Sequence, residues 1–318
     1  MSARWLNLIE NTVQSQALSH ELKEKQIRIA YFFLFSTSIL WGATFILTKL
    51  LIAQIPIFWV TFIRHLIALL GFTPFFSKFR NIDKKILGMA LLTGGANFFA
   101  LTLQTFGLRT ISTGKSAFLT GLYVILIPFI GFILYRQRIT KRLWLSVIVA
   151  FGGMSILIFN SGEGLDFTSS IEIGDILTIG CAVLFALQIA LTEKFAPQVD
   201  VVLLSMLQLA VVSMLALLFI IGLEPQNPLG TVSSYLWSVW IILALLSTTL
   251  PFLFQNWGQR YVPATPTALI FALEPVFATI FGYLIGNEPI TWALILGGGL
   301  IFLAIVIAVQ RSKPNTGY

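Results

Sequence analysis

The sequence predicts an all-α integral membrane protein with ten transmembrane helices, built as two inverted five-helix repeats with both termini in the cytoplasm. An apolar composition, a series of apolar runs of membrane-spanning length and a pattern that occurs twice support this prediction. Of the 318 residues, 57% are hydrophobic and 10% are charged, whereas a soluble domain has about 25% charged residues. The composition therefore excludes an ordinary soluble protein.

The apolar runs predict the helices. A membrane-spanning helix needs about 20 apolar residues, because lipid offers its backbone no hydrogen-bond partners. Ten such runs follow one another, near residues 31–53, 57–76, 86–108, 113–134, 142–160, 174–195, 201–222, 237–259, 264–285 and 291–310. Residues 1–28 are polar and predict a cytoplasmic arm, either soluble or lying as a helix on the membrane surface. Residues 312–318 would form a cytoplasmic tail.

Basic residues between the runs predict the orientation. If the helices simply alternate, 16 basic residues fall on one side of the membrane and two, Arg109 and Lys115, on the other. Cytoplasmic loops are enriched in lysine and arginine. We therefore expect a multi-pass protein of the inner (plasma) membrane with cytoplasmic termini, and we attribute the net charge of +7 to this bias rather than to nucleic-acid binding.

The repeat is visible without gaps. A shift of 151 residues places Gln104, Gly107 and Arg109 on Gln255, Gly258 and Arg260, and a shift of 144 places residues 41–51 on 185–195. The repeats cover residues 29–160 and 174–311. Because each holds an odd number of helices, the second must enter the membrane inverted. Inverted repeats are typical of secondary transporters, in which two related halves rock around a site near the membrane midplane.

Four segments then carry a family resemblance: residues 40–45 (LWGATF), Arg64, residues 113–128 (TGKSAFLTGLYVILIP) and residues 264–291 (ATPTALIFALEPVFATIFGYLIGNEPIT). In this order they resemble the EamA-type transporters of the drug/metabolite transporter superfamily. The resemblance implies a carrier of small organic molecules whose central cavity is lined mainly by helices 1, 3, 4, 6, 8 and 9. Because that superfamily transports amino acids, sugars, nucleotide derivatives and drugs, it leaves the substrate open.

Charged residues at membrane depth are candidates for function, since each costs about 2.5–3.5 kcal/mol to insert. Arg64 and Lys115 could attract a substrate carboxylate or phosphate; Arg64 could equally anchor helix-end carbonyls, and Lys115 could simply be solvated at the outer surface. Glu274 could couple transport to protons or remain neutral and repair the kink at Pro275. Its repeat mate is Tyr123, which should face it across the symmetry axis. Further candidates for substrate binding are Trp41, Asn97, Gln104, Gln255 and Asn256.

Enzyme motifs are missing from the sequence. It contains no HExxH or Walker A motif, two histidines and one cysteine, Cys181, so we expect no enzyme, cofactor or metal site. The expected partners are a small-molecule substrate, the lipid bilayer and protons, with no nucleic acid and no obligate protein partner. The sequence thus predicts a secondary active transporter for a carboxylate-bearing or zwitterionic metabolite such as an amino acid. The alternative is an exporter of lipophilic drugs or toxic metabolites with the same fold.

Overall fold

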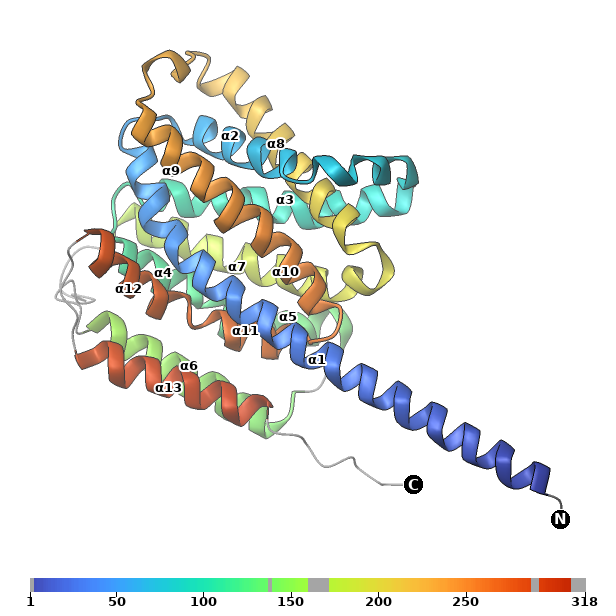
Figure 1. Cartoon of the computed structure of the whole chain (residues 1–318). Coiled ribbons are helices and arrows are strands. Elements are labelled where there is room, and N and C mark those ends of the chain that lie inside the picture. The colour runs from blue at the N-terminus through green and yellow to red at the C-terminus, as the bar shows by residue number, and fades with distance from the viewer. Residues whose placement is uncertain (1–2, 137–138, 160–171, 287–291, 310–318) are drawn as a thin grey trace.

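The computed structural model describes residues 3–136, 139–159, 172–286 and 292–309, and these ranges contain helices and turns but no strand (Figure 1). The predicted tail and most of the link between the repeats lie outside the described residues. The first repeat comprises α1 (Ala3–Ile52), α2 (Ile57–Leu70), α3 (Lys84–Gly107), α4 (Thr113–Gly121), α5 (Tyr123–Tyr135) and α6 (Lys141–Phe159). The second comprises α7 (Ile173–Phe195), α8 (Val201–Leu223), α9 (Ser234–Ala244), α10 (Leu250–Gln259), α11 (Ala264–Phe271), α12 (Glu274–Gly286) and α13 (Trp292–Val309).

Short helical segments join some of these elements. They are η1 (Thr73–Asn81), η2 (Ala196–Gln198), η3 (Leu229–Thr231) and the π-helical segment η4 (Leu245–Thr249). Segment η4 lies between α9 and α10, so that these three elements form one continuous rod from Ser234 to Gln259.

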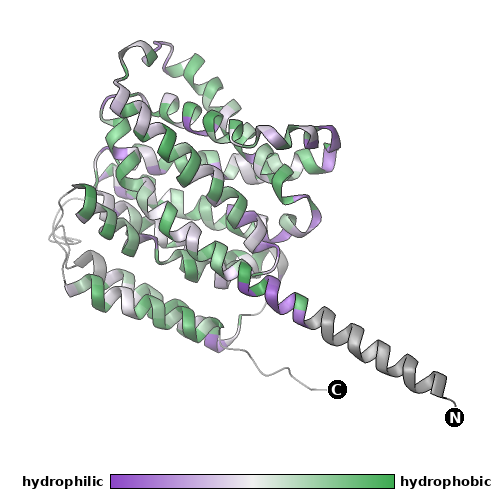
Figure 2. Ribbon diagram, in the orientation of Figure 1, coloured by the Kyte–Doolittle hydropathy of each residue, from purple (hydrophilic) through white to green (hydrophobic). Residues whose placement is uncertain are grey.

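Eight helices of the described chain are long and apolar enough to cross a membrane, or nine if the bent pair of α2 and η1 counts as one span. Figure 2 colours the ribbon by hydropathy and shows apolar residues along most of the length of these helices. The two other predicted spans contain α2 and α6. Helix α2 has 14 residues, which reach about 21 Å at 1.5 Å per residue. Gly71 and Pro74 follow it, and the chain bends by 89° into η1. Helix α6 has 19 residues and begins with two basic side chains.

Helix α1 continues past the predicted boundary at residue 28. It runs for 50 residues from Ala3, so the predicted arm and the first span form one helix. Its N-terminal part extends away from the other helices (Figure 1).

The two repeats run in opposite directions through the bundle. Near the end of α1, Lys49 Nζ donates to the carbonyl oxygen of Ile111, just after α3, at 3.4 Å. The start of α7 lies beside the same end of α3, because a Cβ atom at Gly174 would lie 2.8 Å from the carbonyl oxygen of Gly107. Helix α7 therefore begins where α1 ends.

Helix packing follows the repeat. The third helix of each repeat packs on the first helix of the other, as α3 on α7 and α10 on α1. Likewise α12 packs on α1 and α5 on α7, while α2 packs on its mate α8 and α6 on its mate α13. This exchange is what a pseudo-two-fold axis between the halves produces, and it places the faces of α1, α3, α7 and α10 around that axis.

Both repeats contain a broken helix at matching positions. Helices α4 and α5 are separated at Leu122, and α11 and α12 at Ala272 and Leu273. In the second repeat Pro275 explains the break, because proline lacks the N–H that would continue the helical hydrogen bonds. The first repeat has Val124 at that position, so proline does not account for its break. The breaks leave the first residues of α5 and α12, Tyr123 and Glu274, at two new helix N-termini.

Candidate functional site

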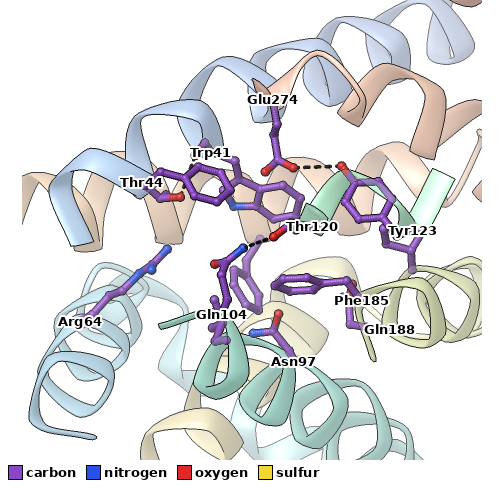
Figure 3. A pocket seen from close by; sticks show the side chains of 14 residues that line it. Trp41, Thr44, Arg64, Asn97, Gln104, Thr120, Tyr123, Phe185, Gln188 and Glu274 are labelled. Carbon is purple, nitrogen blue, oxygen red and sulfur yellow. Dashed lines mark hydrogen bonds between the residues drawn. The ribbon is translucent and has the colours of Figure 1, made fainter. Parts of the chain in front are cut away.

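A cavity lies at the centre of the bundle, between helices of both repeats (Figure 3). It encloses about 490 Å³ between its side chains, including space open to solvent, and the centre of a water-sized sphere can occupy about 30 Å³ of it. It is therefore narrow in this conformation. Its lining consists of Trp41, Thr44, Phe45, Arg64, Asn97, Leu101, Gln104, Thr120, Tyr123, Phe185, Gln188, Ile189, Phe252 and Glu274.

Repeat mates form most of this lining. Ten of the 14 residues make five pairs related by the shifts of 144 and 151 residues. The pairs are Trp41 with Phe185, Thr44 with Gln188, Phe45 with Ile189, Leu101 with Phe252, and Tyr123 with Glu274. The cavity therefore lies on the pseudo-two-fold axis, where transporters with inverted repeats hold their substrates.

Tyr123 and Glu274 meet directly, which confirms the prediction that they face each other. The Tyr123 hydroxyl donates to Glu274 Oε2 at 2.9 Å (Figure 3). Both residues are buried, with 2% and 6% of their surface exposed. Each begins a half-helix, and the partial positive charge of a helix N-terminus favours a carboxylate there. The geometry thus provides Glu274 with one strong hydrogen-bond donor and leaves its Oε1 oxygen for a second interaction.

Arg64 enters the same cavity from α2. Its Nε donates to Thr248 Oγ1 at 2.6 Å and its Nη2 to the carbonyl oxygen of Ser247 at 3.3 Å, both in η4. Pro251 lies four residues after Ser247 and has no N–H, so this carbonyl lacks its usual helical donor. The arginine therefore binds a carbonyl inside the continuous element from Ser234 to Gln259, whereas one of the two sequence interpretations expects carbonyls at a helix end. No hydrogen bond from Nη1 is found in the described part of the chain.

The two charged side chains are not paired with each other. No basic side chain lies within salt-bridge distance of Glu274, and no acidic one within that distance of Arg64, among the described residues. Figure 3 shows Arg64 entering the cavity from the left and Glu274 from above. The buried Asn97, at the bottom of the same view, has a side-chain nitrogen with no hydrogen-bond partner in the described ranges. Buried polar groups are normally satisfied, so this amide is a candidate for binding a ligand.

Gln104 and Trp41 are two further predicted residues that line the cavity. Gln104 Nε2 donates to Thr120 Oγ1 at 3.0 Å, which orients the amide at the cavity surface. The Trp41 ring packs edge-on against Phe271 with 5.0 Å between the ring centroids. Trp41, Arg64, Asn97, Gln104, Tyr123 and Glu274 thus line one cavity, as the sequence predicts that they share a site.

Gln255 and Asn256 lie one layer behind the lining. Gln255 Nε2 donates to Gln188 Oε1 at 3.1 Å and to Gln259 Oε1 at 3.0 Å, and Gln259 donates to the carbonyl of Ile189 at 2.8 Å. Asn256 donates to Ser205 and Gln208 in α8. A series of buried amides therefore leads from the cavity toward the end of α10.

Lys115 is not part of the lining. Its Nζ lies 2.8 Å from Asp175 Oδ1, in an ion pair that joins the start of α4 to the start of α7. Both side chains are largely buried, with 18% and 12% exposed. The structure thus gives Lys115 a protein carboxylate as its partner, and its predicted contact with substrate stays a prediction.

Several lining residues were missed in the sequence: Thr44, Phe45, Leu101, Thr120, Phe185, Gln188, Ile189 and Phe252. The repeat could have found one of them directly, because Phe185 is the mate of Trp41, whereas Thr44 and its mate Gln188 were both missed. No group of three or more His, Cys, Asp or Glu residues that could hold a metal occurs within the described ranges.

Comparisons with known proteins agree with this architecture. An uncharacterized transporter of Archaeoglobus fulgidus is 29% identical over 274 residues, covering 86% of this chain and 83% of that one. The uncharacterized transporter YetK of Bacillus subtilis is 26% identical over 299 residues, covering 91% and 89%. A probable terminal-alkyne amino-acid exporter of Streptantibioticus cattleyicolor is 42% identical over 55 residues, covering 17% and 18%.

A solved crystal structure shares the fold, with a TM-score of 0.70 and 18% identity over 88% of this chain and 96% of that one. The EamA-like transporter family matches twice, over residues 28–159 and 172–310. The chain therefore belongs to the EamA-like transporter family and is a multi-pass membrane transporter.

Proposed function

We propose that this chain is a secondary active transporter for a zwitterionic small metabolite, such as an amino acid, that works by alternating access in an inner membrane. Its ten spans would form two inverted repeats with cytoplasmic termini. The observation that carries the proposal is the cavity on the pseudo-two-fold axis, where a buried cation and a buried carboxyl group face the same space without pairing with each other.

A zwitterion matches these two groups. Its carboxylate would accept from Arg64, and its ammonium would lie near Glu274, while the free Asn97 amide nitrogen would donate to the carboxylate. Trp41 and Phe185 would contact the apolar part of the substrate. The local similarity to a probable terminal-alkyne amino-acid exporter agrees with this substrate class.

Alternating access follows from the repeat. When two halves with one backbone plan exchange conformations, the cavity opens first on one side and then on the other. The amides of Gln255 and Gln259 would line the path on the side where α10 ends. The Lys115–Asp175 ion pair lies where α3 ends and α7 begins, and it would help to close the other side.

Glu274 is the candidate for proton coupling. With a proton, its carboxyl group can donate a hydrogen bond; without one, it can attract the substrate ammonium. A proton and the substrate would then compete for the same group, so that each could favour a different conformation. Glutamine at position 274 keeps the size and the donor but cannot exchange a proton, and therefore tests the coupling role.

The test uses purified protein in liposomes with a panel of radiolabelled amino acids. We expect wild-type protein to accumulate at least one of them against its gradient when a proton gradient is applied. We expect Glu274→Gln to lose this accumulation but to keep exchange of the same amino acid between equal, saturating concentrations, with a lower affinity because the charge that attracts the ammonium is gone. If Glu274→Gln still accumulates the amino acid with unchanged pH dependence, the coupling role is refuted and Glu274 only repairs the kink at Pro275.

The second candidate is an exporter of lipophilic compounds, and the cavity wall supports it. Six of the 14 lining residues are apolar or tryptophan: Trp41, Phe45, Leu101, Phe185, Ile189 and Phe252. In this case Arg64 and Lys115 would be structural, and uncharged aromatic compounds, rather than amino acids, would exchange in the same liposomes.

A further inference from the structure

A second hollow opens on the flank of the bundle, between α1 and α13 with α11 as its floor. We call it the α1–α13 groove. The centre of a water-sized sphere can occupy about 390 Å³ of it, far more space than the central cavity offers. Its lining consists of Tyr31, Phe35, Ile270, Leu273, Phe302, Ile305, Val306 and Val309.

The lining selects an apolar occupant. Apart from the Tyr31 hydroxyl, its side chains carry no hydrogen-bonding group, so water in the groove would find few partners. The groove also lies along membrane-spanning helices, and its rim residues Phe35, Phe302 and Val306 have 39%, 59% and 38% of their surface exposed. The lipid bilayer surrounds this face, and its acyl chains are the apolar groups available to enter.

Charged side chains lie on α1 beyond one end of the groove, where Glu21, Glu24, Lys25 and Arg28 line a separate hollow. Arg28 precedes Tyr31 by three residues and Phe35 by seven, so the three side chains share one face of α1. The Arg28 side chain is 83% exposed, and its contact with Glu24 is long, at 3.8 Å. On α6, Arg142 donates to the carbonyls of Ile307 and Ala308 near the end of α13. Basic side chains at the mouth of a groove between helices bind anionic lipid head groups.

We infer that the α1–α13 groove binds one acyl chain of an anionic phospholipid, with the phosphate held by Arg28. The bound chain would contact Ile270 and Leu273, which lie on the two sides of the break between α11 and α12. Leu273 directly precedes Glu274 in the chain. A lipid in the groove therefore packs against the same broken helix that carries the buried carboxyl group.

Crosslinking of residues at the floor of the groove distinguishes a lipid inside the groove from a lipid on the surface. Ile270 and Leu273 are only 2% and 5% exposed, so a lipid that merely covers the surface cannot label them. The experiment uses phosphatidylglycerol with a diazirine on one acyl chain, in nanodiscs with full-length protein, and maps the crosslinked residues by mass spectrometry. We expect labelling at Ile270 or Leu273.

Two pairs of variants test the binding mode. Val306→Trp fills the groove and should reduce labelling of the floor at least fivefold, whereas Leu303→Trp, on the exposed side of the same helix, should not. Arg28→Gln should reduce it about fivefold, since one basic side chain near the surface contributes about 1 kcal/mol, and Lys25→Gln should have a smaller effect. Size-exclusion chromatography and melting verify that each variant folds.

An unlabelled floor, or equal labelling in Val306→Trp and wild-type protein, would overturn the proposal. Phosphatidylcholine with the same diazirine distinguishes the head group. Equally strong labelling by this zwitterionic lipid, or no effect of Arg28→Gln, would refute the phosphate contact. Because these measurements concern binding alone, they do not depend on which substrate the central cavity transports.

Discussion

Replacing Arg64 by glutamine removes a buried cation while keeping a polar side chain in its place. Among the described residues, no acidic side chain forms an ion pair with this guanidinium. In the proposed site, the substrate carboxylate would be its acidic partner. A hydrogen bond to a charged group is worth about 1.5–3 kcal/mol, which corresponds to about a 10- to 150-fold change in affinity. We therefore expect Arg64→Gln to weaken binding of a zwitterionic amino acid by that factor.

The stability of the unliganded protein should change much less. Arg64→Gln removes the hydrogen bonds to Thr248 and Ser247, but it also removes the cost of burying a charge without a carboxylate partner. These effects oppose each other, so we expect the free energy of unfolding to change by less than about 2 kcal/mol. Thr248 keeps its own bond to the carbonyl of Leu243 at 2.8 Å.

The assay is thermal melting of purified protein against a panel of free amino acids, because a ligand stabilises the state it binds according to its concentration relative to Kd. Lys49→Gln serves as the matched control, since it removes a basic group outside the cavity lining. An Arg64→Gln protein that melts at a clearly lower temperature but binds the same amino acid as tightly as wild type would refute the reasoning. Arg64 would then only anchor η4.

Three further predictions concern other parts of the chain. Lys115→Gln and Asp175→Asn should each destabilise the protein by about 1–3 kcal/mol, because each breaks the same partly buried ion pair. For the same reason, the two losses of stability should not add up in the double variant. If Lys115→Gln instead weakens substrate binding at least tenfold and leaves the melting temperature unchanged, the predicted substrate contact of Lys115 would be supported. Burial raises the pKa of Asp200, but hydrogen bonds from Lys78 and from the backbone N–H of Leu203, with the charge of Lys78, outweigh this and hold that pKa below its usual value. Stability from this carboxylate is thus present above its unfolded pKa and is lost as the pH falls through its folded pKa. The melting temperature of wild-type protein should therefore exceed that of Asp200→Asn at pH 7, and the two melting temperatures should converge below about pH 4. In a Cys181→Ala protein, single cysteines at positions 84 and 200 should react with an impermeant thiol reagent from the cytoplasmic side and one at position 227 from the opposite side; labelling of all three from one side would contradict the inverted repeat.

The repeat in the sequence predicted the contact at the centre of the cavity. Two ungapped shifts identify which residues are equivalent, and equivalent residues near a two-fold axis must lie close to each other. This is why the contact between Tyr123 and Glu274, 151 residues apart, could be predicted without a structure. The same argument applied to Thr44 and Gln188 would have extended the predicted cavity.

Contacts that break the repeat could not be predicted in this way. Lys115 and Asp175 have Pro266 and Tyr31 as their repeat mates, so no symmetry argument brings the two charges together. The position of Arg64 likewise depends on how α2 packs against η4, where Pro251 leaves a carbonyl free. The length of α2 was overestimated because apolar composition continues past Gly71, although the chain bends there.

The charges of the cavity are distributed less symmetrically than its backbone. Arg64 belongs to the first repeat and has the neutral Gln208 as its mate, while Glu274 belongs to the second and has Tyr123. If the halves exchange conformations, the backbone around the cavity is nearly reproduced, but the cation and the carboxyl group are not exchanged. A charged substrate or a proton therefore meets different surroundings when the cavity faces each side of the membrane. Only such a difference in binding free energy between two states allows a ligand to shift their populations, so the unequal charges on a symmetric backbone would let the substrate and a proton favour different conformations.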